Sequence, residues 1–481
     1  MKLNNAIFSG VAVILMGVWI CSAPANAAGD VRDVKNFGAV GDGVSDDTAA
    51  LQAAIDDLPE DGGIVYIPAG TYMVANLRLK SGTDLRGAGQ ATVLRARPDA
   101  ATILGFADGP QDRIRISDLV VDGNKEEQSD SGFGLYLPPG SPTTNLAVER
   151  VRFQNHKYDA IVIGRSNYLP EQDHRNLLFR DIEIRTTDKT GILIQSGSDI
   201  WIDHAHIVNV GSANGDAGIE TAQRSNVSNL SITNSRIEGS AHHNIFLCDT
   251  SNARIENNYL YFAGRVDESG SGIQANRAYA ETMTGLTVVG NTIEASLGYS
   301  ICTSGVDEFV MVGNRIKGGE VDGDPGIRVG GGSKNWVISG NTITDVRSIG
   351  LAVVAEPADQ SVNATISGNL IQGCVMWGIA LSGGQNISVT GNTIIDNGTW
   401  QQIEAENRSG IMIGGGQHVI VTGNRIGNSP GNSTQTYGVL EVGASDFNSI
   451  YGNDLSNNAV AAYVTVGDNT RVWSNQGVAE K

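Results

Sequence analysis

Short segments in which hydrophobic and polar residues alternate fill most of the chain, and they recur at a regular interval. The motif Gly-Asn-Thr-Ile occurs at 290–293, 340–343 and 391–394, with close variants at 313–316, 368–371, 423–426 and 452–455. Weaker copies extend back to Phe153, and successive copies are 23 to 33 residues apart, about 27 on average. A repeat of this length indicates a fold built by stacking one unit many times.

Each repeat contains two further segments that are typical of β-strands. One begins at a small residue, as at 191–194, 272–275 and 410–413, and the other directly precedes the Asn motif, as at 336–339 and 387–390. Residues alternate between two faces along a strand, and one repeat cannot bury its hydrophobic side unless another stacks on it. We therefore predict an all-β fold, a single-stranded right-handed parallel β-helix of about twelve rungs with a short N-terminal capping helix.

Two sequence features predict how this rod is completed. The repeated Asn follows a Gly at a strand boundary, and we expect it to adopt the left-handed conformation at a turn and to stack from rung to rung. The segment 48–55 is amphipathic and follows Ser45-Asp46-Asp47, which indicates a helix with an acidic N-cap. Because solenoids need capped ends, we expect this helix to cover the N-terminal end of the core.

The first 27 residues have the features of a signal peptide. Lys2 precedes a hydrophobic run over 6–20, and Ala25-Asn26-Ala27 matches a cleavage site. We therefore divide the chain into a signal peptide, 1–27, and a β-helix domain, 28–481, whose N-terminal cap spans 31–72. This segment predicts a secreted or periplasmic protein, and no other stretch approaches the length of a membrane span. The remaining cysteines, at 248, 302 and 374, are predicted to be buried thiols.

The net charge of the chain narrows the class of molecule that the protein can bind. The chain has 33 Lys and Arg against 52 Asp and Glu, for a formal net charge of −19. Nucleic-acid binding requires basic surface, so a general nucleic-acid binder is excluded. An anionic substrate would need a local cluster of basic side chains.

The N-terminal segment resembles a known family. The run Asn36-Phe-Gly-Ala-Val-Gly-Asp-Gly-Val-Ser-Asp-Asp-Thr-Ala-Ala-Leu-Gln-Ala-Ala-Ile55, followed by Gly63-Ile-Val-Tyr-Ile-Pro-Ala-Gly-Thr-Tyr72, is similar to the N-terminal cap of the pectate-lyase-like superfamily. That superfamily includes polygalacturonase-type hydrolases, polysaccharide lyases, mannuronan C5-epimerases and phage tailspikes. The resemblance implies a parallel β-helix that binds a polysaccharide, but a scaffold motif does not specify the reaction.

The active-site motifs of the best-known members do not carry over. The epimerases have an Asp-Pro-His-Glu-like run on a middle rung. The most similar region here, 158–165, has Val162 and Gly164 where the Asp and His would face outward. The hydrolase pattern of Asn-Thr-Asp followed by Asp-Asp is also absent. The site must therefore be sought from the rungs themselves.

Aligning the rungs on positions 160, 191, 218, 244 and 272 places a group of polar side chains on one face. Outward positions two residues later are Val162, Leu193, Glu220, Phe246 and Gln274. Polar residues before and after these strands are Tyr158, Lys189, Asp216, His242, Arg224, Asp249, Asn276 and Arg277. We take Glu220, Asp249, His242, Asp216 and Lys189 as candidate catalytic residues. Arg224, Gln274, Asn276, Arg277 and Tyr158 are candidate substrate-binding residues.

This group fits more than one reaction on a polysaccharide. Hydrolysis of a glycosidic bond needs two carboxylates about 5 to 9.5 Å apart, which neighbouring rungs can supply. Cleavage by β-elimination, or C5-epimerisation, needs a base for the proton next to a carboxylate and a cation to neutralise that carboxylate. A hydrolase or lyase is our first hypothesis. A C5-epimerase and a non-catalytic glycan-binding or adhesive rod remain alternatives.

The pattern predicts no certain cofactor or metal ligand. The turn Asp322-Gly-Asp324 is a candidate for calcium, since acidic turns supply the oxygen ligands that Ca²⁺ prefers. The sugar, the mode of chain cleavage and the oligomeric state are not determined by these residues.

Overall fold

The computed structural model describes residues 30–98, 100–129, 132–164, 174–213, 215–266, 268–280, 282–318, 324–355 and 361–478. The predicted signal peptide, 1–27, lies outside these residues. No helix within the described ranges is long and hydrophobic enough to cross a membrane.

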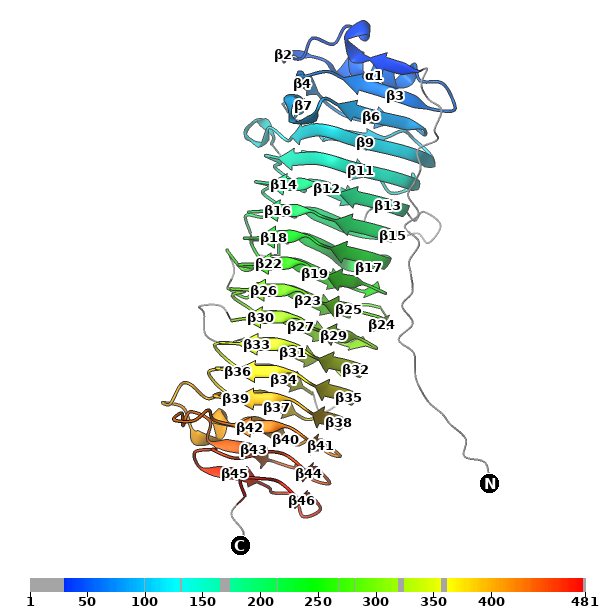
Figure 1. The fold of residues 1–481 in the computed structure, drawn as a ribbon. Helices are drawn as coiled ribbons and strands as arrows, with labels where there is room; N and C mark the ends of the chain where they lie inside the picture. Colours follow the sequence, from blue (N-terminus) through cyan, green and yellow to red (C-terminus); the bar gives the residue numbers. More distant parts are fainter. Residues whose placement is uncertain are drawn as a thin grey trace, which may run out of the picture.

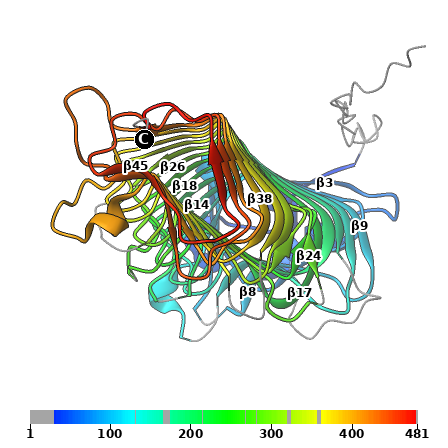
Figure 2. The ribbon, with the colours of Figure 1, turned by 90° about the horizontal axis from the view of Figure 1, so that it is seen from below.

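The chain forms a long rod of stacked rungs, as predicted (Figure 1). Every strand pairing recorded between the rungs is parallel, and 44 of the described strands join into one continuous sheet. This sheet has three faces, which we call sheets 1, 2 and 3 in the order in which each rung visits them. When the rod is seen from below, the rungs superpose on one another (Figure 2).

Sheet 1 corresponds to the segments that begin at a small residue. Its strands are β5 (Leu77–Leu79), β8 (Thr102–Phe106), β10 (Phe133–Leu137), β12 (Ile161–Ile163), the first residues of β15 (Ile192–Asp203) and β17 (Ile219–Thr233), β19 (Ile245–Cys248), β23 (Ile273–Asn276), β27 (Ile301–Ser304), β31 (Ile327–Gly330), β34 (Leu351–Val354), β37 (Ile379–Ser382), β40 (Ile411–Gly414), β43 (Tyr437–Val442) and β45 (Ala461–Val464).

Sheet 2 corresponds to the segments that precede the Asn motif. Its strands are β1 (Val31–Asp33), β3 (Gly63–Ile67), β6 (Thr83–Gly87), parts of β9 (Gln111–Asp122) and β11 (Thr143–Gln154), β13 (Arg175–Arg180), the last residues of β15 and β17, β21 (Arg254–Glu256), β25 (Thr287–Val289), β29 (Val310–Val312), β32 (Lys334–Ser339), β35 (Val362–Ser367), β38 (Gln385–Thr390), β41 (Ile420–Thr422), β44 (Ser449–Tyr451) and β46 (Arg471–Trp473).

Sheet 3 contains the residues that follow the repeated Asn. Its strands are β2 (Asp42–Asp46), β4 (Gly70–Val74), β7 (Thr92–Ala96), the last residues of β9 and β11, β14 (Glu183–Arg185), β16 (His206–Val208), β18 (Arg236–Glu238), β22 (Tyr259–Tyr261), β26 (Thr292–Glu294), β30 (Arg315–Lys317), β33 (Thr342–Thr344), β36 (Leu370–Gln372), β39 (Thr393–Ile395) and β42 (Arg425–Gly427). Short strands β20 (Thr250–Ser251), β24 (Met283–Thr284) and β28 (Val306–Asp307) lie between sheets 1 and 2.

The register keeps hydrophobic side chains in one continuous core. On sheet 1, Ile192 pairs with Ile219, which pairs in turn with Ile245, and all three are fully buried. Residues one position later, such as Glu220, point to the opposite face because side chains alternate along a strand. The inward and outward assignments predicted from the alternation are therefore correct on these rungs.

The repeated Asn residues form a buried ladder at the corner between sheets 2 and 3. The Asn314 Nδ2 group donates to Asn341 Oδ1 at 2.9 Å, and the Asn341 Nδ2 group donates to Asn369 Oδ1 at 3.0 Å. The predicted stacking is confirmed, but the predicted left-handed conformation was assigned to the wrong residue. The preceding glycines adopt it, with φ of +65° at Gly340, because a residue without Cβ meets no steric penalty there.

Helix α1 (Thr48–Asp56) covers the N-terminal end of the core, as predicted. Its Leu51 and Ile55 side chains are fully buried in that core. The capping differs in detail, because Asp46 Oδ1 accepts the Thr48 N–H at 3.0 Å while the Asp47 carboxylate turns back to accept backbone N–H groups at 40 and 41. Short 3-10 helices occur at η1 (Val34–Phe37), η2 (Gly89–Ala91), η3 (Lys125–Glu127) and η5 (Ala405–Arg408).

Candidate active site

The outer face of sheet 1 is bordered by two sets of turns. We call the turns that lead from sheet 3 into sheet 1 the 3–1 turns, and those that lead from sheet 1 to sheet 2 the 1–2 turns. The strand pairings align one outward column, which consists of Tyr136, Val162, Leu193, Glu220, Phe246, Gln274, Cys302 and Arg328. The column is thus polar or aromatic over the middle rungs, where the sequence predicts the site.

Three carboxylates gather where the 3–1 turns meet sheet 1. We call Asp159, Asp216 and Glu220 the acid cluster. Thr190 joins two of them, because its backbone N–H donates to Asp159 Oδ1 at 2.9 Å and its hydroxyl donates to Glu220 Oε2 at 3.2 Å. The Asp159 and Glu220 oxygens are therefore no more than about 9 Å apart. Lys189 Nζ lies 3.7 Å from Asp216 Oδ1, so a cation belongs to the same group.

Burial makes two of these carboxyl groups unusually weak acids. Asp159 is 9% exposed, and its burial, with the nearby negative charge of Asp216, raises its pKa to about 7. Burial also raises the pKa of Glu220 to about 7, and the charges of Asp159 and Asp216 raise it further. The hydrogen bond from Thr190 acts in the opposite direction and lowers it. Both groups can therefore exchange a proton close to neutral pH.

An imidazole pair lies on the next rung. The His242 and His243 rings are 3.6 Å apart between centroids, and the His243 ring stacks on Phe246 at 5.1 Å. His243 Nδ1 accepts the Ser271 N–H at 2.9 Å, which fixes its ring, and His242 Nε2 lies 3.2 Å from Ser269 Oγ. The contact between Ser271 Oγ and Gln274 Oε1, at 3.1 Å, extends this polar strip by one more rung.

Asp249 lies at the other edge of sheet 1, in the 1–2 turns. Its carboxylate accepts backbone N–H groups from Ala278, Tyr279, Ala280 and Arg224 at 2.8 to 3.2 Å. Burial alone would raise its pKa, but these four donors together lower it. The carboxylate therefore holds two turns together and remains ionised.

Most of the predicted substrate-binding residues lie along this second edge. Arg224 packs its guanidinium over the Tyr279 ring, 4.4 Å from the centroid. Asn276 ends β23, and its Oδ1 atom is shielded from solvent without a hydrogen-bond partner among the described residues. Arg277 follows it and lies beside Gly305 on the next rung. These residues lie at the edge of sheet 1 opposite to the acid cluster.

The structure thus brings together Lys189, Asp216 and Glu220, with His242 one rung away. It separates Asp249 from Glu220 by about 11 Å between Cα atoms, since Asp249 lies one rung on and three residues farther along the strand. Tyr158 is near the cluster, with its ring 5.6 Å from that of Phe133. The catalytic and binding roles of these residues remain predictions.

The prediction missed Asp159. This residue directly precedes Ala160, the point on which the rungs are aligned, and it lies in the region compared with the epimerase run. That comparison considered outward positions within the strand and not the turn before it. A search for acids one residue before each alignment point would have found it, because that column contains Asp159, Thr190 and His243.

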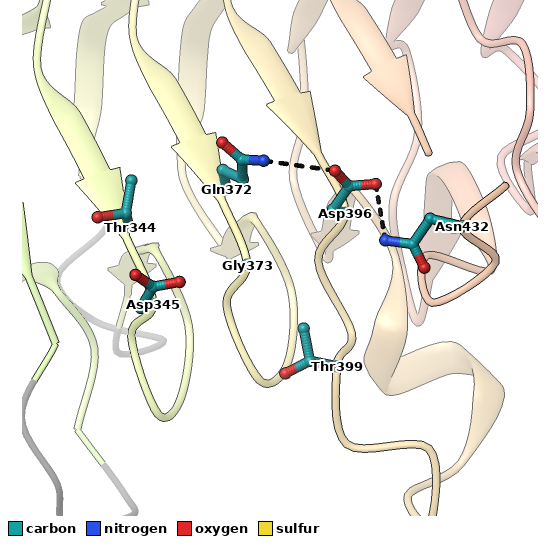
Figure 3. Close-up of a pocket in the computed structure, with 7 residues that line it drawn as sticks. All are labelled: Thr344, Asp345, Gln372, Gly373, Asp396, Thr399 and Asn432. Carbon is teal, nitrogen blue, oxygen red and sulfur yellow. Dashed lines mark hydrogen bonds between the residues drawn. The ribbon is translucent and has the colours of Figure 1, made fainter. Parts of the chain in front are cut away.

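A separate pocket of about 480 Å³ lies farther along the rod, where β33, β36 and β39 end (Figure 3). At its centre, Asp396 accepts hydrogen bonds from Gln372 Nε2 at 3.4 Å, from Asn432 Nδ2 at 2.9 Å and from the Ser429 backbone N–H at 2.7 Å. Burial alone would raise the pKa of Asp396, but these donors together lower it. Asp396 thus fixes the surrounding turns, in contrast to the weakly held protons of the acid cluster.

The described residues contain no group of three or more His, Cys, Asp or Glu side chains that could hold a metal ion. Of the proposed calcium turn, Asp322 lies outside the described residues. Asp324 lies near Tyr299 and Arg328, and its burial raises its pKa. The calcium site therefore stays a prediction.

Comparison with known proteins gives two family matches. Residues 31–259 match the family model for rhamnogalacturonase A/epimerase, pectate lyase-like, and residues 263–481 match that for periplasmic copper-binding protein (NosD). Copper prefers nitrogen and sulfur ligands. The C-terminal half has a single histidine, His418, whose ring is stacked on Phe447 at 5.5 Å, and Cys302 and Cys374 are buried. The described residues of this half do not fit a copper site.

Individual relatives match over shorter segments. The chain is 36% identical over 168 residues to mannuronan C5-epimerase AlgE2 of Azotobacter vinelandii, which is 31% of this chain and 16% of that protein. It is 32% identical over 205 residues to alginate lyase 7 of the same organism, which is 39% of this chain and 23% of that protein. The matched segments are thus less than a quarter of each relative.

A solved structure supports the fold over nearly the whole chain. The pre-mature form of gene product 12 of bacteriophage phi29 superposes with a TM-score of 0.58 at 17% identity, over 92% of this chain and 73% of that chain. At this identity the likeness concerns the fold alone. Taken with the family match to the N-terminal half, it agrees with the motifs of the cap. Residues 31–259 thus match the pectate lyase-like family, and the fold of the chain is that of a parallel β-helix.

Proposed function

We propose that the protein acts on a uronate-containing polysaccharide by moving the proton at C5 of a sugar, as a lyase or an epimerase. One observation carries this proposal. Asp159 is buried and Glu220 is half-buried, both contact Thr190, and both have a pKa of about 7 at the edge of sheet 1. Two of the relatives are an alginate lyase and a mannuronan C5-epimerase, whose chemistry begins with that proton.

The acid cluster has the properties that such a reaction needs. A general base works best when its pKa is close to the working pH, which is the condition of Glu220. Glu220 would accept the C5 proton, and the electron pair of the broken C–H bond would move into the sugar carboxylate. Lys189, held 3.7 Å from Asp216, would stabilise the negative charge that develops there.

The second carboxyl group decides what happens next. Because both groups have a pKa of about 7 and the charge of Asp159 raises the pKa of Glu220, we infer that the pair holds one proton near neutral pH and offers one base and one acid. In a lyase, the electron pair forms a C4–C5 double bond as the C4–O bond breaks, and an acid protonates the departing oxygen. In an epimerase, an acid returns a proton to C5 from the opposite face. His242, on the next rung, is the further candidate donor.

Hydrolysis is a second candidate, because the same two carboxyl groups are suited to it. Their oxygens are within about 9 Å, which includes the separations used by glycoside hydrolases, and one can be protonated while the other is ionised. The description of the matched family also names a rhamnogalacturonase. We place either activity in the periplasm or the medium, because of the predicted signal peptide and the description of the C-terminal family.

The experiment that tests the proposal uses alginate, pectate and rhamnogalacturonan in deuterated water, with calcium and with chelator. A lyase gives new reducing ends together with the ultraviolet absorbance of unsaturated uronate. An epimerase gives deuterium at C5 without chain cleavage, and a hydrolase gives reducing ends without that absorbance. Binding of the polysaccharide with none of these changes would contradict the proposal and favour a binding rod.

Variants then connect the activity to the cluster. We expect Glu220→Gln and Asp159→Asn each to lower turnover by about 100-fold or more, since each removes a proton-transfer group and keeps the shape of the side chain. Glu256→Gln is the matched control, because its carboxylate pairs with Arg254 on sheet 2, away from the groove. Equal turnover of Glu220→Gln and wild type would exclude this site.

A further inference from the structure

Two arginines lie on the outer face of sheet 1 and at its edge, beyond the acid cluster. Arg328 belongs to the outward column, four rungs after Glu220, and Arg277 follows the end of β23. Each lies over a glycine on the surface of the sheet. A Cβ atom added at Gly330 would lie 2.7 Å from Arg328 Nη1, and one added at Gly305 would lie 3.0 Å from Arg277 Nε. Any larger residue at these two positions would displace the guanidinium groups.

The two arginines lie over glycines on neighbouring rungs. The Gly305 N–H donates to Gly330 O at 3.0 Å, so the glycines beneath them are direct neighbours on adjacent rungs. The Arg277 N–H donates to Ser304 O at 2.9 Å, which binds the backbone of the first arginine to the rung between them. Arg328 Nη1 also lies 3.8 Å from Cys302 Sγ, so its side chain is held along the sheet.

The electrostatic setting of this pair favours an anion. The chain has a formal net charge of −19, and many of its arginines pair with carboxylates, as Arg150 does with Asp118 at 2.6 Å. Among the described residues, no carboxylate oxygen lies within 4.0 Å of either guanidinium. The carboxyl of Asp324 is the acid that senses the charge of Arg328. Neither arginine has a carboxylate in direct contact among the described residues, so an anionic ligand would find two unpaired guanidinium groups there.

We propose that Arg277 and Arg328 form a distal subsite that binds the carboxylate of a uronate sugar, an inference that rests on the proposed function. Guanidinium groups match the two oxygens of a carboxylate, which a neutral sugar lacks. Four rungs separate Glu220 from Arg328, about 19 Å along the rod. A chain that reaches both must span several sugars and lie along the axis of the rod. The subsite therefore selects long, anionic chains.

The test measures binding in a protein that cannot turn over its ligand. Oligouronates of increasing length are titrated calorimetrically into the Glu220→Gln protein and into the same protein with Arg328→Gln or Arg277→Gln added. Arg315→Gln is the matched control, because Arg315 lies in β30 on sheet 3, outside the groove. A neutral oligosaccharide and a sulfated neutral oligosaccharide of the same length are titrated in parallel.

We expect each groove variant to bind the longest oligouronates at least about 10-fold more weakly, with equal binding of disaccharides, because one charge-assisted contact is lost only in chains that reach it. The control should bind every length as the parent does. Equal weakening at all lengths, no weakening, or preference for the sulfated ligand would overturn the proposal.

The same data separate this proposal from the proposed function. Arginine-dependent binding of long oligouronates without turnover by the wild type would keep the subsite and reject the reaction. Turnover of uronate chains with arginine-independent binding would keep the reaction and reject the subsite. Failure to bind any oligouronate would reject the subsite.

Discussion

Replacing Glu220 by Gln should make the protein more stable above neutral pH while abolishing its activity. The ionised carboxylate of Glu220 is half-buried beside Asp159 and Asp216, and Gln keeps its size and can still accept the hydrogen bond from Thr190. The substitution thus removes an unfavourable charge with little change in packing. A residue that lowers stability in its own protein is typical of a functional site.

The magnitude follows from the two pKa values. The pKa of Glu220 is about 7 in the folded protein, against 4.5 for the ordinary carboxyl. A group whose pKa is raised by folding binds its proton more tightly in the folded state, so stability is present below pH 4.5 and is lost as the pH rises to about 7. The full loss corresponds to about 3 kcal/mol. The variant should therefore gain about 3 kcal/mol over wild type at pH 8, and less than about 1 kcal/mol at pH 5.

Urea denaturation of both proteins at pH 5 and pH 8 measures this difference. Because the charge of Asp159 raises the pKa of Glu220, the double variant with Asp159→Asn should gain less than the sum of the two single gains. Glu256→Gln should show no pH-dependent gain. A variant less stable than wild type at pH 8, or an equal difference at both pH values, would refute the reasoning that the carboxylate is buried and strained by its neighbours.

Three further predictions concern the scaffold. Asn341→Ala should lower the free energy of unfolding by at least about 2 kcal/mol in urea denaturation, because it leaves buried polar groups of the ladder unpaired. Thr342 faces outward, so Thr342→Ala should lower it by less than about 1 kcal/mol. Asp249→Ala should speed hydrogen exchange of the backbone amides at 278–280 by about 10-fold or more, because these amides lose a charged acceptor. Unchanged exchange would mean that other contacts hold the turn. Leu51→Ala should lower the free energy of unfolding by about 2 to 5 kcal/mol in thermal or urea unfolding, because this fully buried side chain closes the end of the core. A smaller decrease would mean that the helix is dispensable for stability.

The stacking direction and the alternation along each strand explain why the fold was predictable. The pairing of Ile192 with Ile219 and then Ile245 follows from aligning the same small residue in successive repeats, and Glu220 then has to face outward. Even the Asn ladder is evident from the repeated motif. The conformation of Gly340 was assigned to its neighbour because the motif alone does not say which of two turn residues carries the positive φ.

The site was predictable only where strand geometry controls it. Glu220 lies within a strand and was correctly oriented, whereas Asp159 lies in the preceding turn, where alternation does not set the side-chain direction. Aligning whole rungs also placed Asp249 and Glu220 in one group of candidate residues, although the width of the sheet separates them. The raised pKa of the acid cluster depends on burial by turns of different length, which repeats in the sequence do not reveal.

The outward column of sheet 1 has a consequence for how such proteins change their substrate. Each rung contributes one side chain to it at a constant spacing, and beyond Arg328 the column continues with Ala352, Ala380 and Met412. The backbone beneath these small or unbranched residues is the same as beneath Glu220. A longer or differently charged groove can therefore arise by single substitutions that leave every hydrogen bond between the rungs in place, so the ligand range of this scaffold can evolve one rung at a time.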